Sequence, residues 1–133
     1  MQRHALAFFT SAPIYGLAGM VWGAAMGASG DHGMLPAHAH LNLLGMVLNG
    51  IMGGFYALAA DKVSRRWAWG NFVVFNVGVL IMIPTLAQLL TLGETTEAAK
   101  KLVPIIVTSE VLVIAGLLAF LVSVVGLWRK PAS

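Results

Sequence analysis

The sequence has no cysteine and little charge, since only 10% of its 133 residues are Asp, Glu, Lys or Arg. Disulfides, thiolate zinc sites, iron–sulfur clusters and covalently attached c-type haem are therefore excluded, because each needs a sulfur ligand or anchor. A soluble domain is typically about a quarter charged, so this chain has too little charge to give a folded core a water-compatible surface. Any metal or haem must be held by His, Met or oxygen ligands.

Apolar residues are abundant instead: they make up 59% of the chain, and the mean hydropathy is +0.85. Four apolar segments each exceed the roughly 18 residues that mark a membrane-spanning helix. The connections between these segments are too short to form a soluble domain. The sequence predicts an all-α integral membrane protein with a four-transmembrane-helix bundle. It is expected to be a single domain over residues 1–133, with spans at about residues 6–28, 36–60, 69–92 and 102–127.

The distribution of Lys and Arg predicts the orientation, because positive residues near span ends are retained in the cytoplasm. Two of the eight, Lys100 and Lys101, lie on one predicted side together with Glu94 and Glu97. The six on the other side are Arg3, Lys62, Arg65, Arg66, Arg129 and Lys130. We expect a multi-pass protein of an inner (cytoplasmic) membrane with both termini cytoplasmic. The net charge of +3 is attributed to topology and lipid contacts and not to nucleic-acid binding.

The first span carries a ridge of small residues. The ridge consists of Gly16, Gly19, Gly23 and Gly27. Apolar burial drives little association in lipid, so small residues help there by letting helix backbones approach closely. The ridge therefore predicts tight packing, within the bundle or between protomers. In the third span, Asn71 and Asn76 are predicted to be interhelical hydrogen-bond partners and not ligands.

Polar side chains inside a span are costly, and here they gather at the start of the second span. One face of this helix is polar or small along its whole length, at alternating spacings of four and three. That face carries His38, Asn42, Gly45, Asn49, Met52 and Tyr56. His40 lies about 200° round the helix from His38, so on a regular helix the two imidazoles serve different sites. The alternative is that both histidines cap the helix at the outer interface, but two histidines with two asparagines favour a site.

A family resemblance lies in residues 38–45, His-Ala-His-Leu-Asn-Leu-Leu-Gly. This segment resembles the His-x-His segment of the catalytic subunit of haem–copper oxidases and nitric-oxide reductases. In that family the first histidine binds the high-spin haem and the second binds the low-spin haem. The family's subunit has twelve helices in three arcs of four, and this chain has the length of one arc. The resemblance thus implies a subunit I-like relative that assembles as a homotrimer in the lipid bilayer.

The resemblance also implies a cofactor, which is haem b, with copper as the alternative. The haem would be held between protomers by one histidine from each of two neighbours. The residues implied for this site are His38, His40, Asn42, Gly45 and Asn49. His32 in the first loop is a further candidate metal ligand. The family's copper site needs an adjacent His-His pair, which this sequence lacks, so oxygen reduction is not expected. Any activity would be that of an oxidoreductase, and the expected role is electron transfer, with a redox partner, or redox or gas sensing.

Other residues leave alternatives open. Glu110 in the fourth span is a candidate proton relay or partner for a histidine. Alternatively, that helix begins near Thr108 and Glu110 lies in its first turn, where acidic residues are favourable. Asp31 and His32 form either a solvated turn or an entry site for metal or a propionate.

Two other functions fit the same sequence. One is a small metal or proton transporter or channel that uses the face formed by His38, Asn42, Asn49 and Glu110. The other is a noncatalytic membrane assembly protein, in which the glycine ridge would matter and the histidines would not. The presence of bound haem would distinguish the expected haem protein from both of these alternatives.

Overall fold

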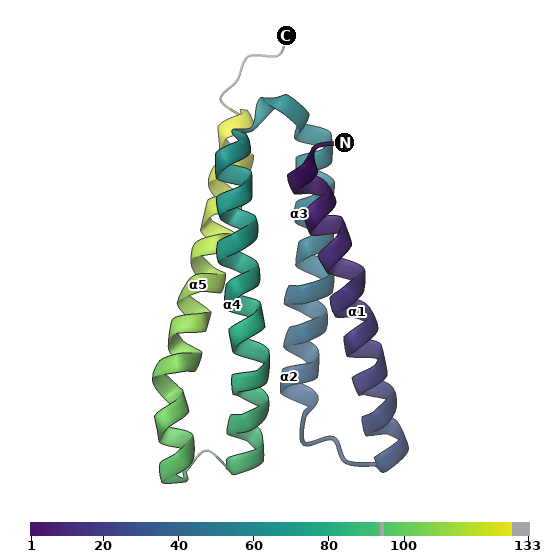
Figure 1. Ribbon diagram of the computed structural model, residues 1–133, viewed down its shortest axis with the longest axis vertical. Coiled ribbons are helices and arrows are strands. Elements are labelled where there is room, and N and C mark those ends of the chain that lie inside the picture. Colours follow the sequence, from purple (N-terminus) through teal and green to yellow (C-terminus); the bar gives the residue numbers. More distant parts are fainter. Residues whose placement is uncertain (94, 129–133) are drawn as a thin grey trace.

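The computed structural model describes residues 1–93 and 95–128 of the protein. In this part of the chain four helical spans run side by side with alternating direction (Figure 1). They are α1 (Arg3–Ser29), a second span made of four stacked segments, α4 (Arg65–Leu92) and α5 (Glu97–Trp128). The four segments of the second span are α2 (Leu35–His40), the π-helix η1 (Leu41–Leu48), α3 (Asn49–Ala59) and the 3₁₀ turn η2 (Ala60–Lys62).

Each of the four spans is long and apolar enough to cross a membrane, which confirms the prediction of an all-α, multi-pass membrane protein. The predicted limits of the first three spans agree with the structure to within four residues. The largest difference is in the fourth span, which begins at Glu97 and not near residue 102. The first two turns of α5 include Lys100 and Lys101, whose charges favour a loop in the sequence.

Glycine and proline set the short connections. α1 ends where Gly30 adopts a left-handed φ of 70° and its N–H donates to Met26 O at 3.0 Å. Pro36 lies in the first turn of α2. The N–H groups of a first turn have no partner within the helix, so proline, which lacks an N–H, costs no hydrogen bond there. α4 also ends at a glycine of positive φ, since Gly93 has φ 77° and its N–H donates to Leu89 O at 3.1 Å, but its ψ of 130° lies outside the left-handed helical region. These stops allow consecutive spans to pack as antiparallel neighbours.

The spans form two hairpins, with α1 beside the second span and α4 beside α5 (Figure 1). Glycine brings the second pair together: a Cβ added at Gly78 would lie 2.9 Å from the backbone N of Val113. A Cβ added at Gly116 would lie 2.6 Å from Phe75 Cβ. Close backbone approach of this kind is how helices gain packing contacts in lipid.

An aromatic cluster joins the two hairpins near the end at which α1 begins. Tyr56 of α3 stacks on Phe8 of α1, with ring centroids 5.5 Å apart. Phe120 of α5 meets Phe55 of α3 edge to face at 5.1 Å, and Phe8 meets Phe72 of α4 at 5.0 Å. All four spans therefore share one core in this half of the bundle.

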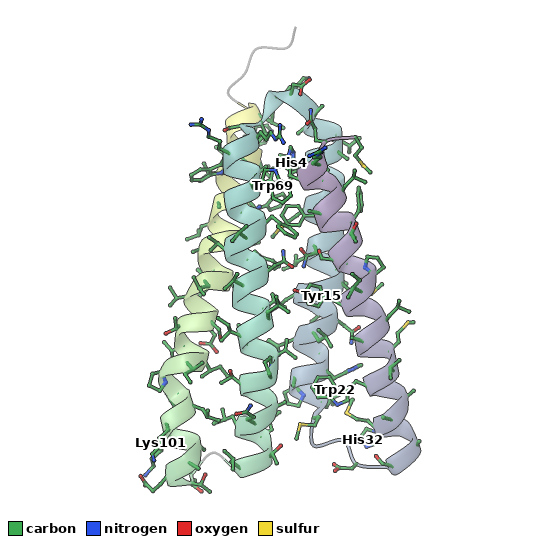
Figure 2. The ribbon with its side chains drawn as sticks, viewed as in Figure 1. His4, Tyr15, Trp22, His32, Trp69 and Lys101 are labelled. Carbon is green, nitrogen blue, oxygen red and sulfur yellow. The ribbon has the colours of Figure 1, made fainter. Side chains whose placement is uncertain are left out.

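Charge is distributed unequally between the two ends. Figure 2 shows His4 and Trp69 near one end and His32 and Lys101 near the other. The four described positive residues of the predicted cytoplasmic group, Arg3, Lys62, Arg65 and Arg66, lie at the end with His4. Arg129, Lys130 and Glu94, which also entered the orientation argument, lie outside the described residues.

Candidate functional site at the start of the second span

The glycine ridge of α1 receives the polar face of the second span. A Cβ added at Gly23 would lie 2.9 Å from His38 Cε1, and one added at Gly19 would clash with the Asn42 amide. Gly16 lies opposite Met46 in the same way, at 2.7 Å from its sulfur. Tight packing within the bundle thus accounts for three of the four ridge glycines. Gly27, by contrast, has no atom within 4 Å of an added Cβ in the described residues.

His38 is therefore held between α1 and the second span, where it is half-buried. The side-chain amide of Asn42, one turn along, donates to His38 O at 3.0 Å. The Asn42 amide nitrogen also lies 3.4 Å from His38 Nδ1 and 3.3 Å from Nε2. Both distances are longer than a usual N–H hydrogen bond, so neither ring nitrogen is tied by a short bond.

His40 faces away from α1 and is exposed, as its two-residue spacing from His38 predicts. Its Nδ1 lies 2.8 Å from Pro36 O, one turn back along the helix. A carbonyl oxygen can only accept, so Nδ1 carries the proton and donates. In the neutral ring this leaves Nε2 with a free lone pair. Metal-binding histidines are commonly oriented in this way, with the second ring nitrogen donating to a carbonyl.

The loop before the second span forms a compact exposed turn. Asp31 Oδ1 accepts from the Gly33 N–H at 2.9 Å, and His32 Nδ1 lies 3.0 Å from Gly30 O. Both side chains are exposed, and their contacts stay within the loop. These contacts are those of a solvated turn, the first of the two alternatives for Asp31 and His32.

Gly45 and Asn49 continue the polar face toward the bundle centre. A Cβ added at Gly45 would lie 2.6 Å from Tyr15 Cγ of α1. Asn49 is fully buried, and its amide donates to Gly45 O at 2.9 Å and to Leu44 O at 3.3 Å. Its Oδ1 accepts from Asn76 of α4 at 3.0 Å. Asn49 is thus a hydrogen-bonded structural partner between two spans.

Glu110 lies deep along α5, about 20 Å from Glu97 at 1.5 Å per residue. The alternative of a helix beginning near Thr108 is therefore wrong, and Glu110 is nearly four turns from the start of α5, not two. Its side chain is exposed. In the described residues no ion pair or hydrogen bond joins it to His38, Asn42 or Asn49. The four residues of the predicted transport face do not come together in one chain.

Metal-binding side chains are dispersed as well. Among the described residues, no three His, Asp or Glu side chains are close enough together to hold a metal ion.

A second polar cluster, in the opposite half of the bundle, was not predicted as a site. Tyr56 Oη accepts from Asn71 Nδ2 at 2.8 Å and lies 3.1 Å from Ser123 Oγ of α5. The Asn71 and Asn76 bonds confirm the predicted interhelical role of both residues. His4, 1% exposed, packs edge to face against the Tyr56 ring at 5.5 Å. The sequence does indicate that His4 is buried. His4 and Gly16 are separated by three steps of four residues, so they lie on the same face of the helix, which is the face of the glycine ridge.

Comparisons of the whole chain with protein-family models, with curated proteins and with solved structures found no match.

Proposed function

We propose that this protein binds haem b in the membrane and acts in electron transfer or in redox or gas sensing. The observation that carries the proposal is the geometry of His40, whose Nδ1 donates to Pro36 O while the exposed ring presents Nε2 outward. Neutral imidazole held in this way is a common axial ligand for haem iron. The resemblance of residues 38–45 to the His-x-His segment of haem–copper oxidases agrees with that donor chemistry.

In this proposal the haem sites lie between copies of the chain. His38 and His40 face in different directions, so one copy offers one histidine to each of two sites. A closed homotrimer would give every site two histidines, and up to three haems. A haem with both axial positions filled exchanges electrons and binds few external ligands, which favours electron transfer. The end with Arg3, Lys62, Arg65 and Arg66 would face the cytoplasm of a bacterial-type inner membrane.

The test is haem content after purification in mild detergent from cells supplied with a haem precursor. The reduced-minus-oxidised spectrum should show a Soret shift and an α band, and a pyridine haemochrome assay should identify haem b. His38→Ala and His40→Ala should each abolish the bands. The matched control is His32→Ala, which removes a histidine at the same end of the bundle and should retain them.

Three outcomes would contradict the proposal. The first is the absence of haem in the unsubstituted protein, and the second is full retention of haem by His40→Ala. The third is metal-dependent flux into liposomes by protein that carries no haem, which is the behaviour of a transporter. A His38→Ala protein that behaves like the unsubstituted one in every assay would instead indicate the assembly role.

A further inference from the structure

The half of the bundle that carries Arg3 and Trp128 contains buried polar atoms that the protein itself does not satisfy. Among the described residues there are four buried side-chain atoms without a hydrogen-bond partner. They are His4 Nδ1, His4 Nε2, Asn71 Oδ1 and Asn76 Oδ1. More than nine in ten buried polar groups have a partner, which is ordered water where protein provides none. The two His4 nitrogens and Asn71 Oδ1 belong to side chains that both contact Tyr56, so these three atoms point to a shared ligand beside it.

Hydrogen bonds already link part of this region in a fixed direction. The Ser123 hydroxyl lies 3.1 Å from Ala119 O, to which it donates its single hydrogen. The Tyr56 hydroxyl is therefore the donor in its 3.1 Å contact with Ser123 Oγ. Tyr56 Oη in turn accepts from Asn71 Nδ2. The chain of donors runs from Asn71 through Tyr56 to Ser123 and leaves Asn71 Oδ1 without a donor.

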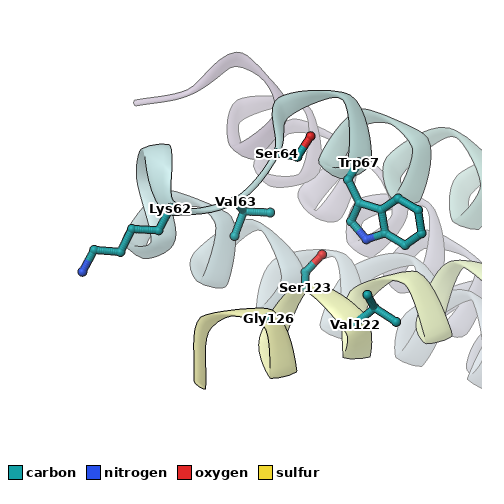
Figure 3. Close-up of a pocket in the computed structure, with 7 residues that line it drawn as sticks. All are labelled: Lys62, Val63, Ser64, Trp67, Val122, Ser123 and Gly126. Atoms are coloured by element: carbon teal, nitrogen blue, oxygen red, sulfur yellow. The ribbon is translucent and has the colours of Figure 1, made fainter. Parts of the chain in front are cut away.

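Ser123 also lines a pocket that opens at this end of the bundle. The pocket has a volume of about 270 Å³, and its wall includes Lys62, Ser64 and Trp67 as well as Ser123. Figure 3 shows the Ser123 side chain pointing from α5 toward the segment that carries Val63, Ser64 and Trp67. At about 30 Å³ per molecule, this pocket holds several waters. Ser123 thus links the hydrogen-bonded pair of Tyr56 and Asn71 to a pocket large enough for solvent.

His4 packs against the same tyrosine, Tyr56. A neutral imidazole has one donor and one acceptor nitrogen, and here neither has a partner. A water molecule can accept from one nitrogen and can also donate to Asn71 Oδ1. Water is therefore the ligand whose chemistry matches both the His4 nitrogens and the amide oxygens, since it is small, neutral, and both donor and acceptor.

We propose that ordered water binds the His4 ring and Asn71 Oδ1 beside Tyr56 and is joined to the pocket through the Tyr56 and Ser123 hydroxyls. This is an internal water site at the end that carries Arg3. When the Ser123 hydroxyl turns away from Ala119 O, the two hydroxyls give the His4 ring a route for proton exchange with bulk solvent although its side chain is 99% buried. The site does not depend on haem, because none of its residues belongs to the proposed haem site.

The test is hydrogen–deuterium exchange of the full chain in lipid nanodiscs, followed by NMR at the His4 ring N–H and the Asn71 amide. Both should exchange on the order of 100-fold faster than the side-chain amide of Asn49, which is also buried but donates to a backbone carbonyl in the bundle centre. In the unsubstituted protein, magnetisation transfer from water should also give cross-peaks at both side chains.

A matched pair of substitutions separates the hydroxyl link from simple blockage. Ser123→Val and Ser123→Thr add the same bulk, but only threonine keeps the hydroxyl. Valine should slow exchange at His4 by about tenfold, and threonine should leave it within about twofold. Asn71 should change less, because it also lines a second pocket of about 400 Å³. Equal slowing of His4 exchange by both substitutions would overturn the link through Ser123. Exchange at His4 no faster than that of the Asn49 side-chain amide, or no water cross-peaks in the unsubstituted protein, would show a dry interior and overturn the proposal.

Discussion

Replacing Gly45 by alanine is expected to push α1 away from the second span. The added Cβ would lie 2.6 Å from Tyr15 Cγ and 2.7 Å from Tyr15 Cβ. Contact between carbons is comfortable at about 3.5–4.0 Å, so the two helices must separate by about 1 Å. Rotation of the tyrosine cannot relieve the contact with its Cβ, which is fixed to the backbone. Overpacking of this kind costs about 1–3 kcal/mol.

The matched control is Gly50→Ala on the same span, because no atom lies within 4 Å of its added Cβ. Both alanines reduce the conformational freedom of the unfolded chain by about 0.4–1 kcal/mol, which cancels in the comparison. Gly45→Ala should therefore be less stable than Gly50→Ala by about 1–3 kcal/mol, or about 5- to 150-fold in the unfolding equilibrium. Reversible unfolding in mixed detergent micelles, followed through tryptophan fluorescence, measures this difference. Equal stability of the two variants would refute the close contact between α1 and the second span.

Two further predictions follow from the same packing and from the orientation. Gly23→Ala should displace the His38 ring at a cost of about 1 kcal/mol and lower haem affinity about fivefold, while Gly27→Ala should leave it unchanged. Haem titration measures both, and equal affinities would contradict the placement of His38 against α1. Because the sequence has no cysteine, Gly33→Cys and Ser64→Cys each give one thiol for a membrane-impermeant reagent. Intact cells should label only the first, and labelling of only the second would reverse the orientation.

The four spans were predictable because a helix that crosses a membrane needs about 20 mostly apolar residues in a row, and such runs are visible in the sequence. The divergence of His38 and His40 was predictable as well, since a spacing of two places residues about 200° apart on a helix. Neither inference required knowledge of tertiary contacts. The partner of the glycine ridge could not be predicted without knowledge of tertiary contacts. In the structure, three of the four glycines pack against the second span.

The cluster at the other end was not predicted because its members lie far apart in the sequence. His4, near the start of the chain, resembles an interfacial residue until Tyr56 and Asn71 are brought against it. Likewise, Lys100 and Lys101 made residues 93–101 resemble a loop, although a helix can carry such charges in its first turns. The depth of Glu110 was misjudged for that reason. Local charge marks the approach to a membrane surface but does not mark where a helix begins.

The π-helix η1 between Leu41 and Leu48 limits how the length of this protein can change during evolution. It lies between the outer histidines and the buried residues Asn49, Met52 and Tyr56. A π-helix holds about one residue more per hydrogen-bonded turn than an α-helix, so one residue can be deleted within η1 if the stretch converts to α-helix, and both parts of the span then keep their facing. Deleting one residue from α2 or α3 would instead rotate the parts on either side by about 100°. Either the histidines or the buried residues would then turn toward lipid. The span can therefore shorten within η1 and not in the α-helical segments beside it.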